Sequence, residues 1–135
     1  MRRFIGLLAL TVMLPLTVWA EGPRDSIKGV ILGQMQAFDA QDAEAAFAYA
    51  SPKIKSIFGT AQNFADMVQR AYPMVWQPGD VRLLELREIA GGPWQKVLVT
   101  DGEGRGHVLD YQMIETPEGW QINAVQLLLA PDAGV

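Results

Sequence analysis

The residues of this chain that could do chemistry lie close together near its end. His107 is the only histidine, and Asp110 and Tyr111 follow it closely. An imidazole has the intrinsic pKa of a general base, and a carboxylate or a phenol hydroxyl could assist it. These three residues are the candidate catalytic set of a small acid–base enzyme.

The candidates lie on one predicted β-hairpin. Its strands span residues 107–115 and 120–128, and Thr116-Pro117-Glu118-Gly119 joins them in an order that suits a type I turn. We expect Thr116 to pair with Gly119, which fixes the register of the whole hairpin.

This register separates the candidates, because successive side chains of a strand point to opposite faces. One face is predicted to carry His107, Leu109, Tyr111, Met113, Ile122 and Ala124. The other is predicted to carry Asp110, Gln112, Gln121 and Asn123. His107 is then left without an inward carboxylate, which favours binding over catalysis at the first face.

The second face also receives apolar residues, namely Val108, Ile114, Val125 and Leu127. A monomer would expose this patch to water, so the pattern predicts a homodimer through the sheet. The alternative is that a flanking segment such as residues 74–79 covers it.

The first half of the chain is predicted to be helical. Apolar residues recur at helical spacing over residues 27–38, and shorter helices are expected after Asp42, Ser51 and Thr60, which can cap them. Residues 74–79 are expected to be an extended connector or short edge strand, before strands at 80–89 and 94–100. Helices followed by an antiparallel meander indicate an α+β fold, with N-terminal helices packed on the sheet.

Composition excludes several classes of function. The chain has 135 residues, a net charge of −4 and no cysteine. The absence of cysteine excludes disulfides, thiolate catalysis and Cys-ligated zinc, and an acidic chain is a poor partner for nucleic acid. With a single histidine, we expect no metal site and no cofactor.

The first twenty residues predict export. Arg2 and Arg3 precede an apolar run from Phe4 to Leu16, and Val18-Trp19-Ala20 forms a cleavage site. This is the pattern of a secretory signal peptide. We therefore expect a periplasmic or secreted protein whose single domain spans residues 21–135 and does not contact the membrane after cleavage. The alternative is an uncleaved membrane anchor.

Short motifs along the chain resemble an uncharacterised family of secreted bacterial proteins, known as a domain of unknown function within the nuclear transport factor 2-like (NTF2-like), or cystatin-like, superfamily. They are Ala37-Phe38 with Asp42, Ser51-Pro52, Phe58-Gly59, Phe64, Met67-Val68, Tyr72-Pro73, Pro78, Tyr111, Met113 and Gly119-Trp120-Gln121-Ile122. The resemblance implies a cone with a cavity between the helices and a concave sheet, and often a dimer. It supplies no catalytic residues.

The interpretation we favour is a small periplasmic binding or interaction module with a mainly apolar cavity and no catalysis. Its expected contacts with a small apolar ligand are Phe38, Phe47, Phe64, His107, Leu109, Tyr111, Met113 and Ile122. One alternative is an isomerase-like or dehydratase-like cavity enzyme using His107, Tyr111 and Asp110. Another is an accessory protein that works through an exposed surface around Trp76 or Trp94.

Overall fold

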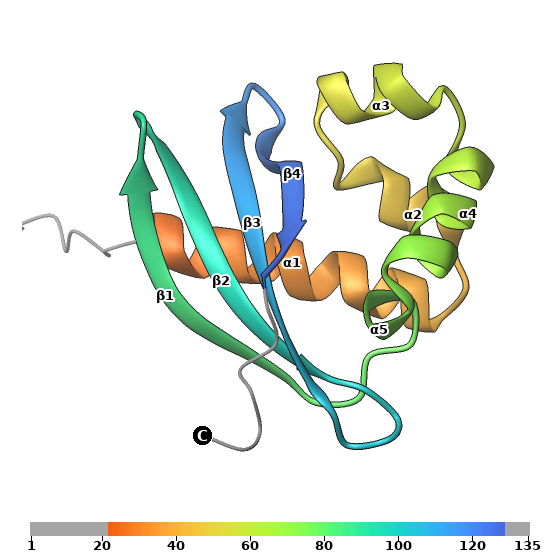
Figure 1. Ribbon diagram of the computed structural model, residues 1–135. Coiled ribbons are helices and arrows are strands. Elements are labelled where there is room, and N and C mark those ends of the chain that lie inside the picture. The colour runs from red at the N-terminus through yellow and green to blue at the C-terminus, as the bar shows by residue number, and fades with distance from the viewer. Residues whose placement is uncertain (1–21, 129–135) are drawn as a thin grey trace, which may run out of the picture.

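The computed structural model describes residues 22–128, so the predicted signal peptide lies outside the described residues. Within them the chain forms α1 (Pro23–Asp39), α2 (Ala43–Ala48), α3 (Pro52–Phe58), α4 (Ala61–Ala71) and α5 (Pro73–Trp76), followed by β1 (Val81–Ile89), β2 (Gly92–Thr100), β3 (Gly106–Thr116) and β4 (Gly119–Leu127). The strands form one antiparallel sheet in the order β1-β2-β3-β4 (Figure 1). The predicted α+β fold class is confirmed.

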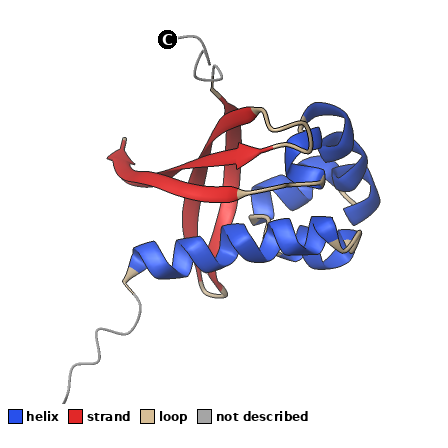
Figure 2. Cartoon of the chain, turned by 90° about the horizontal axis from the view of Figure 1, so that it is seen from below, coloured by secondary structure: helices blue, strands red, loops and turns tan. Residues whose placement is uncertain are grey.

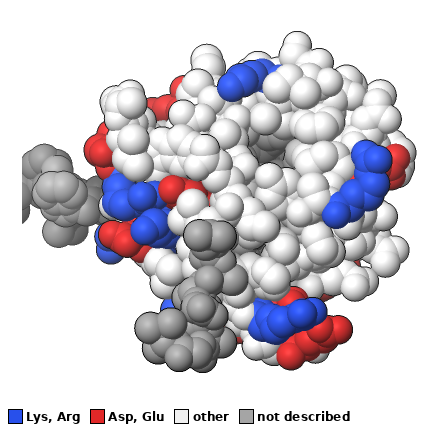
Figure 3. Space-filling model, in the orientation of Figure 1, with Lys and Arg blue, Asp and Glu red and all other residues white. Residues whose placement is uncertain are grey.

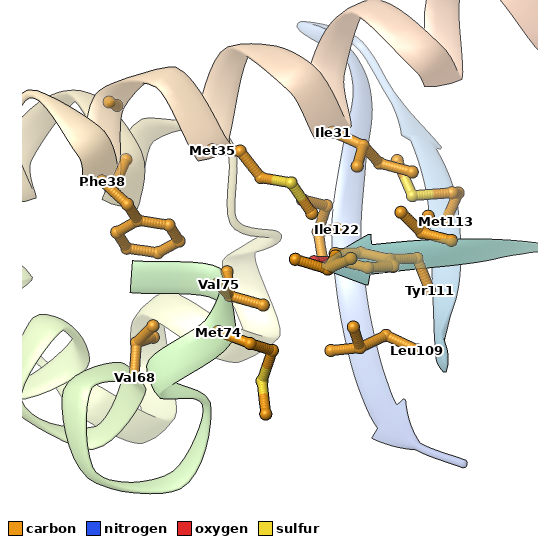
Figure 4. Close-up of a cluster of buried hydrophobic side chains, with 14 of the residues drawn as sticks. Ile31, Met35, Phe38, Val68, Met74, Val75, Leu109, Tyr111, Met113 and Ile122 are labelled. Carbon is orange, nitrogen blue, oxygen red and sulfur yellow. The ribbon is translucent and has the colours of Figure 1, made fainter. Parts of the chain in front are cut away.

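Helix α1 provides the main cover of the sheet. Figure 2 shows it running along one face, with the short helices gathered at one end. Ile27, Ile31, Met35 and Phe38 recur every three or four residues and are at most 2% exposed. In Figure 4, Ile31 and Met35 are directed toward the sheet. The helix begins at Pro23, earlier than predicted, because proline fits the first turn of a helix.

The short helices begin where capping residues allow them to. The side chains of Asp42, Ser51 and Thr60 each accept a hydrogen bond from the backbone N–H three residues on, at 3.1 to 3.3 Å. Such a cap stabilises a helix by about 1 kcal/mol. The three predicted starts are confirmed.

The prediction of an extended connector or short edge strand at residues 74–79 is wrong. Pro73 begins the short helix α5, which buries Met74 and Val75. Trp76 is partly buried, with its ring 5.5 Å from that of Phe38. Burial of these apolar side chains against the core explains why the segment turns inward, and it leaves Trp76 unsuited to be the centre of an exposed surface.

Two bulges interrupt the sheet, and the first lies in β1. The register shifts between Leu83 and Leu86, which leaves extra backbone at Leu84 and Glu85. Gln95, 1% exposed, donates from Nε2 to the carbonyl oxygens of Leu84 at 2.9 Å and Glu85 at 3.3 Å. A side-chain amide thus satisfies carbonyl groups that the ladder leaves free.

The second bulge lies in β4 and changes the predicted register. Thr116 pairs with Gly119 as expected, and the pairing holds as far as Met113 with Ile122. Gln112 then pairs with Ala124, so Asn123 is an extra residue.

Beyond this bulge the faces of β4 are exchanged. Val125 lies opposite Tyr111 and Leu127 opposite Leu109, which puts both on the inner side of the sheet. The prediction that they lie on the outer face is wrong. Val108 and Ile114 remain there, and the homodimer stays a prediction.

The segment between α2 and α3 joins the helices to β4. The backbone N–H of Ser51 donates to the carbonyl of Ile122 at 2.8 Å, and that of Ile122 donates to Tyr49 at 2.9 Å. Ala50 and Ile122 thereby form a parallel bridge. This contact holds the start of α3 beside the outer edge of the sheet.

Candidate functional site

A cavity of about 320 Å³ lies between the inner side of β3 and β4 and the helices. Figure 3 shows a hollow near the middle of this face, surrounded by uncharged residues. Most of the lining is apolar: Phe38, Ala50, Ile54, Ile57, Phe58, Phe64, Met67, Val68, Val75, Ile122, Ala124 and Val125. The polar or charged side chains of the lining are Gln34, Lys53, Tyr72, Tyr111 and Asn123.

Phe64 organises the helical wall of the pocket. Its ring centroid lies 5.8 Å from that of Phe38 and 5.6 Å from that of Phe58, and all three residues line the pocket. Phe47 packs 5.3 Å from Phe64 and is not among the lining residues. The rings meet at tilted or edge-on angles that aromatic pairs favour.

Three of the polar side chains already have partners. Gln34 donates to the carbonyl of Ala46 at 3.1 Å, and the Tyr72 hydroxyl donates to the carbonyl of Val125 at 3.2 Å. Asn123 accepts from Ser51 Oγ at 2.8 Å. These groups are held by the fold, and Lys53 is exposed at the pocket's edge.

The hydroxyl of Tyr111 differs from them. The residue is 1% exposed, and within residues 22–128 its oxygen has no hydrogen-bond partner. Figure 4 shows the side chain directed from β3 toward the helices. Burial raises the pKa of Tyr111, to which nearby Tyr72 also contributes, so the hydroxyl stays protonated at neutral pH.

Of the eight predicted contacts, four line the pocket, namely Phe38, Phe64, Tyr111 and Ile122. Leu109 and Met113 share the inner face but are buried in the core, 0% and 3% exposed. They are absent from the lining because the core packed around them is filled, whereas the hollow opens toward α3 and α4.

His107, predicted as a contact with the ligand, is not among the residues that line the pocket. Its Nε2 lies 2.8 Å from Oδ2 of Asp101, in the loop between β2 and β3. The backbone N–H groups of Glu103 and Arg105 also donate to Asp101, each at 2.9 Å. Together these hydrogen bonds lower the pKa of Asp101 to about 2, and the bond with His107 contributes most. The sequence-based expectation missed this carboxylate partner, because a loop supplies it.

Asp110 faces away from the pocket, as the alternation predicts. Nη2 of Arg87 donates to its two carboxylate oxygens at 2.6 and 2.5 Å, on the outer side of the sheet. This pairing raises the pKa of Arg87. Among the described residues that line the pocket there is no Asp, Glu or His.

Sequence reasoning missed the wall contributed by α3. Ile54, Ile57 and Phe58 recur at helical spacing, a signal visible in the sequence, and all line the pocket. It also missed Asn123 and Val125 because of the β4 bulge. The change in apolar spacing, three residues from Ile122 to Val125 and then two to Leu127, is the signal that could have found it.

Residues 22–128 contain neither a metal-binding cluster nor a membrane-spanning helix. No cluster of three or more His, Asp or Glu side chains there could hold a metal ion. Over the same range, none of the helices combines the length and apolar character that spanning a bilayer requires.

Comparison with known families places the chain. Residues 21–135 match a domain of unknown function, DUF4864. The chain belongs to this family. Among curated proteins, the comparison finds no relative of this DUF4864 chain.

Two solved structures resemble this DUF4864 protein. A phospholipid-binding protein from Ralstonia solanacearum, in complex with a phospholipid, is 12% identical, with a TM-score of 0.52 over 79% of this chain and 78% of that chain. An NTF-2 like protein of unknown function from Burkholderia xenovorans is 12% identical, with a TM-score of 0.47 over 82% of this chain and 91% of that chain. The predicted membership of a domain-of-unknown-function family is confirmed, and the Ralstonia solanacearum protein shares the fold. The NTF2-like superfamily stays a prediction.

Proposed function

We propose that this protein is a periplasmic binding module that holds a small apolar ligand in the pocket and does not catalyse a reaction. The observation that carries the proposal is the lining itself, in which apolar and aromatic side chains surround a few polar groups. A volume of about 320 Å³ falls at the lower end of the range of small-molecule sites, about 300–1,000 Å³.

The chemistry of the pocket supports binding over catalysis. General acid–base catalysis requires a group of suitable pKa within hydrogen-bond reach of the substrate. Asp110 is held by Arg87 on the outer face, and His107 is paired with Asp101 away from the lining. The enzyme alternative therefore lacks its general base at the pocket.

The comparison adds support of a limited kind. The Ralstonia solanacearum protein shares the fold and is described as phospholipid-binding. At 12% identity the likeness concerns the fold, so the ligand class rests on this chain's own residues.

Binding of the uncharged fluorophore N-phenylnaphthylamine tests the proposal. Val125 lies opposite Tyr111 and lines the pocket, so Val125→Phe should fill part of the cavity and weaken binding at least tenfold. The matched control is Val108→Phe on the outer face, which should leave affinity unchanged. Circular dichroism verifies that both variants fold. No binding by the wild type, or equal binding by the two variants, would refute the proposal.

The location has a separate test. Export with cleavage after Ala20 predicts a mature protein beginning at Glu21 in the periplasmic fraction. Intact mass measurement after cell fractionation distinguishes this from a membrane-retained chain that keeps residues 1–20.

A further inference from the structure

One polar group of the pocket, the hydroxyl of Tyr111, makes no hydrogen bond within the fold that the structure describes. Gln34, Tyr72 and Asn123 are bonded to other parts of the fold, whereas the Tyr111 hydroxyl is buried without a partner among the described residues. Burying a hydroxyl without a hydrogen bond opposes folding. Phenylalanine would provide nearly the same packing without this cost.

A ligand in the cavity can supply the missing partner. Tyr111 lines the pocket and belongs to the core cluster with Leu109 and Ile122, and the amide of its cross-strand neighbour Gln95 already bonds to backbone carbonyls of β1 and β2. The hydroxyl stays protonated and can therefore donate a hydrogen bond to an acceptor atom of a ligand. The hydroxyl of Tyr72 donates to the carbonyl of Val125, and no hydrogen bond joins it to the hydroxyl of Tyr111.

The electrostatic surroundings restrict the acceptor. Among the described residues that line the pocket, Lys53 is the only charged one, and it is exposed at the edge. A carboxylate buried at Tyr111 would have to be desolvated without an adjacent cation. A carbonyl oxygen of a ketone or ester accepts the same hydrogen bond at a lower desolvation cost.

The volume restricts the size of the ligand. At about 30 Å³ per non-hydrogen atom, the share that a water molecule takes in the liquid, a cavity of about 320 Å³ encloses roughly ten atoms, and the rest of a larger ligand would extend through its open side. The cavity is too small to enclose both chains of a phospholipid.

We propose that Tyr111 is the specificity-determining residue of this pocket and donates a hydrogen bond to the neutral carbonyl oxygen of a small apolar ligand. The inference rests on the proposed function and names the ligand class of the same site. Tyr111 here recognises the ligand, and no chemical step is assigned to it.

The test uses a matched pair of probes, acetylnaphthalene and ethylnaphthalene, which differ by a carbonyl in place of a methylene. Their dissociation constants are measured by displacement of N-phenylnaphthylamine. Tyr111→Phe should weaken the binding of acetylnaphthalene about tenfold, which is about 1.4 kcal/mol. It should change the dissociation constant of ethylnaphthalene less than twofold. Naphthoate should bind the wild type more weakly than acetylnaphthalene.

Tyr72→Phe is the matched control variant, because Tyr72 also lines the pocket but its hydroxyl is bonded to the backbone of Val125. It should leave the ratio of the two affinities unchanged. A second measurement needs no variant: the infrared carbonyl stretch of bound acetylnaphthalene should shift to lower frequency on the wild-type protein.

The outcomes separate this inference from the function on which it rests. An unshifted carbonyl stretch, equal losses for both probes in Tyr111→Phe, or tighter binding of naphthoate would overturn the role of Tyr111 while leaving an apolar binding pocket. A wild type that binds neither probe nor N-phenylnaphthylamine would remove the proposed function itself.

Discussion

Helices α1 and α3 both pack against β4, but they use their apolar residues differently. In α1 the stripe through Ile27 and Ile31 is fully buried, whereas in α3 no residue is buried and Ile57 is 63% exposed. Both helices show apolar residues at helical spacing. The difference lies in length and neighbours: α1 spans 17 residues and runs along the sheet, and α3 spans seven at its edge. An apolar stripe therefore becomes core or pocket wall according to what the rest of the chain places opposite it.

The largest expected effect distinguishes two isoleucines. Ile31→Ala should lower the free energy of unfolding by about 2–5 kcal/mol, because it removes a fully buried side chain from the core. Ile57→Ala on α3 should change it by less than about 0.5 kcal/mol, because that side chain is mostly exposed. Urea denaturation measures both. Equal losses would mean that α3 is part of the core.

A smaller effect tests how α3 is held. Ser51→Ala removes the N-cap of α3 and the hydrogen bond to Asn123. We expect a loss of about 1–2 kcal/mol in urea denaturation, together with weaker binding of N-phenylnaphthylamine. Thr60→Ala, which removes the cap of α4 alone, is the control and should cost about 1 kcal/mol. If Ser51→Ala leaves probe binding intact, the pocket does not depend on the cap of α3.

Without ligand, Tyr111→Phe and Tyr72→Phe should differ in their effect on the free energy of unfolding. The hydroxyl has no partner among the described residues, so its removal should leave the free energy of unfolding unchanged or raise it by up to about 1 kcal/mol. Tyr72→Phe should lower it by about 1 kcal/mol, because it removes the bond to Val125. Thermal denaturation of the two ligand-free variants compares them directly.

The smallest expected effect is on the stability of the protein at low pH, through Asp101. Hydrogen bonds lower the pKa of Asp101 to about 2 in the folded protein, below the unfolded value near 4. Its contribution to stability is therefore present above about pH 4 and is lost as the pH falls toward 2. Asp101→Asn should flatten this part of the stability profile, measured by urea midpoints between pH 2 and pH 5. Steeper acid sensitivity in the variant would contradict the assignment.

The sequence predicted what local chemistry determines. Asp42, Ser51 and Thr60 cap the helices as expected, and Thr116 pairs with Gly119 at the hairpin turn. These features depend on residues within a few positions of one another.

Features that depend on distant parts of the chain were not predicted. The side chain of Asn123 is fixed by Ser51, and the partner of His107 comes from a separate loop. The β4 bulge moved Val125 into the pocket, since one extra residue exchanges the faces of everything after it. Half of the expected ligand contacts, including Phe38 and Tyr111, still line the pocket, because they precede the bulge or lie on helices whose faces the spacing defines.

The short bridge between Ala50 and Ile122 has a consequence for how molecules meet one another. An unpaired outer strand can recruit strands from other chains and so start aggregation. Here β4 is an edge strand, and the backbone groups of Ile122 in it are hydrogen-bonded to the backbone of Tyr49 and Ser51. At the opposite edge of the sheet, the edge strand β1 is interrupted by its bulge. The crossing from α2 to α3 thus protects the sheet against edge-to-edge polymerisation along that stretch of β4, besides positioning the pocket wall.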